Sequence, residues 1–118
     1  MKKTFLYQML LVLALMFCAQ ESMAQASGVI TATPNPATIA AGHTTANVSV
    51  YWAALNSPNG GCLSYVRTAP SYQSGGPGVC GYSGTEVYAL GPGTYFFSLF
   101  SVADFSQLAY LTVTVNGP

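Results

Sequence analysis

Beyond the N-terminal segment, apolar residues recur at alternate positions in short runs, and no stretch repeats them at the spacing of a helix. The clearest run extends from Asn47 to Trp52, where Val48, Val50 and Trp52 fall on one face of a strand. The prolines of Thr33 to Pro36 interrupt the pattern, because proline cannot donate a backbone hydrogen bond. This alternation predicts an all-β domain in which each strand turns one face toward a core.

The same pattern predicts the other strands of the domain. They are Val29 to Thr33, Cys62 to Thr68, Val87 to Leu90, Tyr95 to Ser101 and Leu108 to Val115. Pro70 to Gly84 is rich in glycine and serine, which favours a loop. About seven short strands with turns at this spacing are typical of a sandwich of two sheets.

The N-terminus has the pattern of a signal peptide. Lys2 and Lys3 precede the apolar run from Phe5 to Phe17, and a small-residue cleavage pattern ends at Ala24. The apolar run is shorter than the roughly 20 residues that span a bilayer. We therefore expect residues 1–24 to be removed and residues 25–118 to form one domain, secreted, periplasmic or at the cell surface, with no membrane attachment after cleavage.

Charged side chains are nearly absent after residue 24. Arg67, Glu86 and Asp104 are the only ones, and His43 is the only histidine. One arginine cannot supply the phosphate contacts that drive nucleic-acid binding, so no nucleic-acid partner is expected. These four groups fall in different predicted strands and loops, so we expect no catalytic residues, no metal site, no cofactor and no enzyme activity.

Two cysteines remain once the signal peptide is removed. Cys62 and Cys80 form an even pair in an exported chain, which favours a disulfide bond between them. Their spacing is not C-x-x-C, and no second pair of ligands makes a zinc site with them. In the chain-entropy model, such a bond contributes roughly 3 kcal/mol to stability.

A tyrosine follows the tight turn at Gly91, Pro92 and Gly93. Tyr95 stands where immunoglobulin-like sandwiches have a tyrosine corner, whose hydroxyl bonds to a backbone group upstream. We therefore predict that the ring of Tyr95 is buried.

The strand that begins at Tyr95 also predicts an apolar outer face. If Tyr95 faces the core, alternation turns Phe96 and Phe100 outward. Pairing with the last strand then sets Phe100 near Leu108, Ser98 near Tyr110 and Phe96 near Thr112. The outer face would therefore carry a patch of Phe96, Phe100, Leu108 and Tyr110. Two interpretations stay open: a surface that docks a partner, or core covered by the 70–84 loop.

Both ends of the mature chain resemble a known family. Ile30 to Pro36 and Val48 to Trp52, with Gly93 to Tyr95 and Leu111 to Thr114, are similar to bacterial immunoglobulin-like modules, related to fibronectin type III domains. The resemblance implies an immunoglobulin-like β-sandwich in an exported protein, often attached to a secreted enzyme or a surface protein. A sandwich hosts many functions, so no specific function follows from it.

Two classes of function are consistent with these features. The first is a protein-binding or surface-assembly module, with a cell-surface protein or another copy of the chain as partner. The second is a carbohydrate-binding module in which Tyr65, Tyr72 and Tyr82 contact a polysaccharide, because sugar-binding sandwiches present exposed aromatic rings.

The processed form of the protein gives the first test. We expect the exported protein to begin at Gln25 and to weigh two hydrogen atoms less before reduction than after it. Intact mass spectrometry with alkylation measures both. Two alkylatable thiols in freshly exported material would contradict the predicted disulfide.

Overall fold

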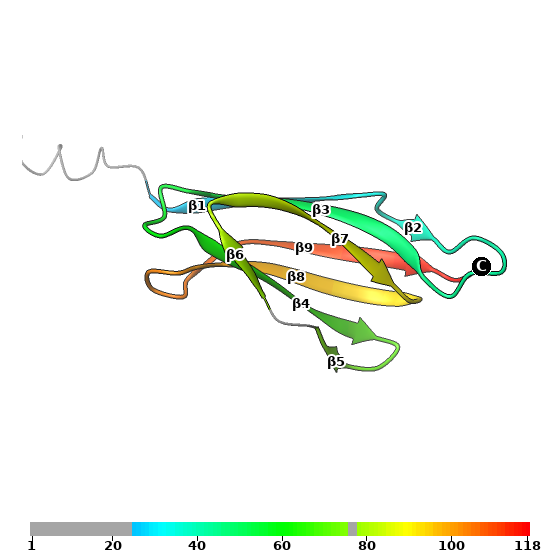
Figure 1. Cartoon of the computed structure of the whole chain (residues 1–118). Helices are drawn as coiled ribbons and strands as arrows, with labels where there is room; N and C mark the ends of the chain where they lie inside the picture. The colour runs from blue at the N-terminus through cyan, green and yellow to red at the C-terminus, as the bar shows by residue number, and fades with distance from the viewer. Residues whose placement is uncertain (1–24, 76–77) are drawn as a thin grey trace, which may run out of the picture.

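The computed structural model describes residues 25–75 and 78–118, which fold into an all-β unit of two sheets (Figure 1). The predicted signal peptide, residues 1–24, lies outside the described residues. Within the described ranges no helix is long and apolar enough to cross a membrane.

The first sheet contains three antiparallel strands in the order β1-β3-β7. These are β1 (Ser27–Thr33), β3 (Ala46–Leu55) and β7 (Ser83–Leu90). The β3 strand is central and pairs with β1 on one side and β7 on the other, so Trp52 lies opposite both Ile30 and Gly84.

The second sheet has the order β2-β9-β8-β4-β5, and β6 also pairs with β4. Its long strands are β4 (Gly61–Ala69), β8 (Gly93–Ser101) and β9 (Gln107–Asn116). Three short strands complete its edges: β2 (Ala37–Thr38), β5 (Gln73–Ser74) and β6 (Val79–Gly81). Figure 1 shows β6 crossing from this sheet toward β7.

The core lies between the two sheets. Val48, Val50 and Trp52 are buried on one face of β3, as the alternation predicts. Leu63 of β4 and Phe97 of β8 are fully buried on the opposing face, with neighbours from both sheets. Each sheet thus contributes one face to a single apolar core.

The 70–84 segment is more regular than the sequence predicts. It contains β5, β6 and the start of β7 in place of one continuous loop. Residues 73 and 74 pair with β4 near its end, and residues 79–81 pair with β4 near its beginning. The reason is that the edge of β4 offers unpaired backbone groups, and this segment satisfies them; the Gly75 N–H also donates to the Tyr65 carbonyl.

Tyr95 is buried, and its hydroxyl donates a 2.8 Å hydrogen bond to the carbonyl of Gly91. This is the geometry expected of a tyrosine just after the turn. Burial raises the pKa of the Tyr95 hydroxyl, although the nearby guanidinium of Arg67 acts in the opposite direction. The hydroxyl therefore remains a neutral donor that fixes the turn to the core.

Replacing Tyr95 tests this hydrogen bond. Tyr95→Phe removes one donor, leaves the Gly91 carbonyl without its partner and changes the volume of the core very little. We expect the variant to fold and to lose about 1–3 kcal/mol of stability, measured by denaturant unfolding. Coincident unfolding midpoints for the two proteins would show that this bond does not hold the turn.

Candidate functional site

The candidate site lies on the outer face of the second sheet, away from the core. On β8 this face carries Phe96, Ser98 and Phe100, which alternate with the core residues Tyr95, Phe97 and Leu99; Phe96 and Phe100 are half-buried and Ser98 is buried. Phe96 pairs with Thr112 and Ser98 with Tyr110, as the sequence predicts. The face is therefore continuous from β8 onto β9.

Leu108 does not belong to this face, which corrects the predicted patch. The β8–β9 register shifts between Leu99 and Phe100, so Phe100 lies opposite Gln107 and Leu108 is the extra residue. Leu108 packs against the core, close to Gly28 of β1, where an added Cβ would stand 2.9 Å from the Leu108 Cβ. The bulge reverses the side to which Leu108 points, and no sequence alternation signals it.

Phe96 and Tyr110 form a stacked pair on the outer face. Their ring centroids are 5.7 Å apart with an interplanar angle of 28°. Tyr110 is 68% exposed and Phe96 is half-buried. The described residues of the 70–84 segment pair along the edge of β4, so they extend the sheet instead of folding over this pair.

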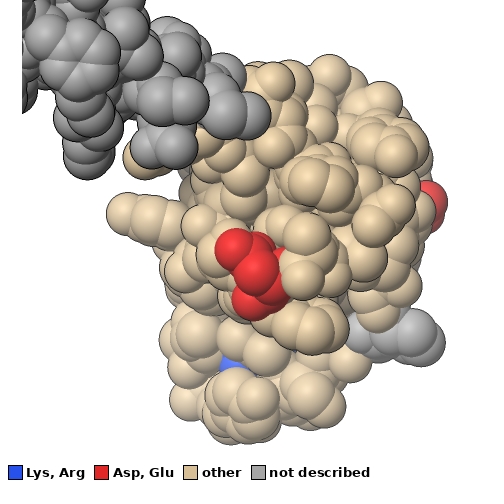
Figure 2. All heavy atoms as spheres, turned by 90° about the vertical axis from the view of Figure 1, so that its left-hand side faces the viewer, with Lys and Arg blue, Asp and Glu red and all other residues tan. Residues whose placement is uncertain are grey.

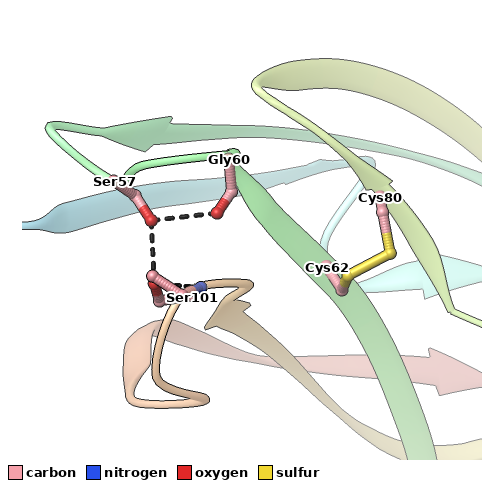
Figure 3. The surroundings of a disulfide bond; sticks show 6 residues. Ser57, Gly60, Cys62, Cys80 and Ser101 are labelled. Carbon is pink, nitrogen blue, oxygen red and sulfur yellow. Dashed lines mark hydrogen bonds between the residues drawn. A yellow bond between two sulfur atoms is a disulfide. The ribbon is translucent and has the colours of Figure 1, made fainter.

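The disulfide bond lies on the same face (Figure 3). Cys62 of β4 lies opposite Phe100 of β8 on one side and opposite Cys80 of β6 on the other. The Cys62–Cys80 bond predicted from the sequence is present, and it fastens the three-residue strand β6 to β4. It also continues the uncharged surface from Phe100 to the sheet edge.

A hollow of about 350 Å³ opens beside the disulfide. Its lining includes Cys62, Phe100 and Val102, together with Phe105 from the loop between β8 and β9. Phe105 is 81% exposed and has φ of 59°, in the left-handed region that large side chains rarely adopt. The loop thus holds one aromatic side chain out beside an apolar hollow.

Hydrogen bonds clamp this loop to the β3–β4 loop (Figure 3). The Ser57 hydroxyl bonds to the Gly60 carbonyl and lies 2.9 Å from the Ser101 hydroxyl, and both serines are buried. Because Ser57 has one proton and gives it to Gly60, Ser101 is the donor to Ser57. The Val102 N–H donates to the Gly60 carbonyl as well.

Within the loop, the Phe105 N–H donates to the Ser101 carbonyl at 2.9 Å. The Asp104 carboxylate accepts hydrogen bonds from the Ser106 N–H and hydroxyl, and these bonds lower the pKa of Asp104. Backbone and side-chain bonds therefore fix the residues on both sides of Phe105.

The three tyrosines proposed for carbohydrate do not come together. Tyr65 packs against the core and is half-buried, with its ring centroid 5.0 Å from those of Tyr88 and Phe97, so its ring is not presented beside the other two. Tyr72 and Tyr82 are exposed, but Tyr72 follows the last residues of β4 and Tyr82 lies beside its first. The inward position of Tyr65 follows from its pairing with buried Phe97.

The charged groups are dispersed over the described residues. His43 lies in the turn before β3, Arg67 on β4, Glu86 on β7 and Asp104 in the β8–β9 loop. No three His, Cys, Asp or Glu residues of the described ranges come close enough to hold a metal ion. Figure 2 looks onto the end of the molecule that bears the β8–β9 loop, and this surface is mostly uncharged, with a group of acidic atoms near its middle.

Comparison with protein-family models, with curated proteins and with solved structures found no match to this chain. The site therefore rests on its own geometry. Sequence reasoning missed Phe105, Val102 and the hollow; a phenylalanine in the turn beside Asp104, where polar residues are usual, was the available signal.

Substitutions at Phe105 test whether its backbone is strained. Asn tolerates the left-handed region and Val does not, so Phe105→Asn should stabilise the domain by about 1 kcal/mol and Phe105→Val should not. Little burial is lost, because the side chain is exposed. Denaturant unfolding of both variants measures the difference, and a destabilised Asn variant would mean that the ring of Phe105 stabilises the fold.

Proposed function

We propose that this chain is an exported, non-catalytic immunoglobulin-like β-sandwich module that binds another protein through the outer face of its second sheet. Two sheets around one core, the Cys62–Cys80 disulfide and the Tyr95 hydrogen bond support the module type. The dispersed charged groups support a binding role without catalysis.

The position of Phe105 is the observation that carries the proposal. An exposed aromatic ring contributes little to folding, and a left-handed backbone at a bulky residue costs energy. The clamp between Ser57, Gly60 and Ser101 nevertheless holds the loop in this shape. Preorganisation of this kind lowers the entropy lost on binding, so it favours affinity for a partner.

The chemistry of the face indicates the kind of partner. Phe105, Phe100 and the Phe96–Tyr110 pair offer aromatic surface, and aromatic residues in apolar hollows are typical anchors of protein interfaces. Of the described charged residues only Asp104 is close, in the loop beside Phe105. A partner with an apolar, weakly charged surface fits this face best.

A photo-cross-linking experiment tests the proposal. Benzophenone-alanine at position 105 should cross-link the exported protein to a partner, whereas the same group at Tyr72, another strongly exposed aromatic away from the site, should not. In a binding assay with the captured partner and no cross-linker, Phe105→Asn, which keeps the loop conformation, should weaken binding about tenfold, and Tyr72→Asn should not.

Insoluble polysaccharides provide the contrasting outcome. If the protein is retained on a polysaccharide, and if retention is lost in Phe105→Asn or in the double variant Tyr72→Asn, Tyr82→Asn, then the module binds carbohydrate instead. Equal cross-linking from positions 105 and 72 would also overturn the proposal.

A further inference from the structure

The edges of the two sheets are not equally protected. Along β9, the Asn35 side chain takes the place of a neighbouring strand: its Nδ2 donates to the Thr112 carbonyl at 3.0 Å, and its Oδ1 accepts from the Thr114 N–H at 3.2 Å. The Ile39 N–H donates to the Asn116 carbonyl at 2.9 Å. Side-chain and loop groups thus occupy backbone sites that a second strand would need.

The edge of β4 pairs with β5 and β6. Among the described strands, β1 and β7 both end the first sheet, and each pairs only with β3. Their surroundings differ, because β1 lies beside β9 of the second sheet, with Gly28 against Leu108, whereas β7 has no comparable neighbour besides β3 in the described ranges. Its eight residues pair with β3 without a register shift, and they include no lysine or proline.

The side chains of β7 alternate regularly. Thr85, Val87 and Ala89 are exposed on the outer face, and Val87 is 61% exposed. Glu86 and Tyr88 are half-buried on the inner side, where burial and the nearby Glu86 carboxylate raise the pKa of Tyr88. The free edge is therefore a regular, uncharged outer surface with one acidic group turned inward.

We propose that β7 pairs with β7 of a second copy of this chain, antiparallel and centred on Val87, so that the two first sheets become one continuous sheet. Directly opposed residues of an antiparallel pair share a face, so a two-fold axis perpendicular to the sheet must pass between the two copies of one residue. The choice of that residue decides which side chains meet.

Only the register centred on Val87 matches side chains along the whole strand. It sets Val87 against Val87 of the second copy, Thr85 against its Ala89, and the Glu86 carboxylate against the hydroxyl-bearing Tyr88. A register centred on Glu86 would oppose two carboxylates, and one centred on Tyr88 would set Glu86 against Leu90. This internal match identifies a second copy as the occupant, because the strand complements itself.

Engineered cysteines in the mature protein, with the Cys62–Cys80 bond intact, test the register. Val87→Cys should give a covalent dimer with a short thiol cross-linker at concentrations where Thr85→Cys alone gives little, because two copies of residue 85 lie four positions apart along the strand. The double variant Thr85→Cys, Ala89→Cys should cross-link again. Equal cross-linking by both single variants would overturn the register.

Sedimentation tests the dimer without a cross-linker. Val87→Lys opposes two like charges on the axis and should weaken dimerisation about tenfold. Ser49→Lys places the same charge beside it on the outer face of β3, away from the edge, and should leave the dimer intact. A wild-type protein that stays monomeric at millimolar concentration, or equal effects of the two lysines, would refute the proposal.

Discussion

Aromatic packing between the two sheets is the interaction on which the rest of this fold depends. Tyr65, Tyr88 and Phe97 meet at centroid distances of 5.0–5.5 Å, and Tyr95 joins them at 6.1 Å from Tyr65. These rings connect β7 of the first sheet to β4 and β8 of the second sheet, and β7 shares no backbone pairing with either strand. With almost no ion pairs available to so uncharged a chain, apolar contact supplies the stability. The outer face and the free β7 edge are presented because this inner contact keeps the sheets together.

Periodicity and local chemistry predicted much of the architecture. The alternation around Val48 and Trp52 predicted the inner face of β3. The even pair of cysteines in a chain with an export signal pattern predicted the Cys62–Cys80 disulfide, and the turn before Tyr95 predicted the backbone hydrogen bond of its hydroxyl. Leu108 was misplaced because a bulge adds one residue without a local sequence signal; Leu108 turns toward the core, whereas Tyr110 keeps its predicted face. The strands in the 70–84 segment were missed because their pairing depends on a distant edge, not on their own composition.

The candidate site shows a similar division. Phe96 and Tyr110 could be placed together from alternation and pairing, both of which are local rules. Phe105 could not, because the conformation of its loop depends on Ser57 and Gly60, which belong to a loop far away in sequence. Tyr65 failed for the converse reason: a tyrosine suits a surface or a core equally well, and only its register opposite Phe97 decides between them. The sequence therefore predicted which face of a strand a side chain occupies better than it predicted the conformation of loops and the pairing of edge strands.

The Asn35 side chain has a wider consequence for how this molecule can assemble. A β-domain with two open edges can add copies at both and grow into a fibril, whereas a domain with one open edge is monovalent and terminates at a pair. The side-chain amide of Asn35, which lies between two prolines, bonds to backbone groups of β9 as a residue of a neighbouring strand would. It therefore blocks the β9 edge as a second site at which a copy could add. A protein with so few charges lacks the electrostatic repulsion that keeps most chains apart, so small neutral caps of this kind matter more for preventing edge-to-edge association.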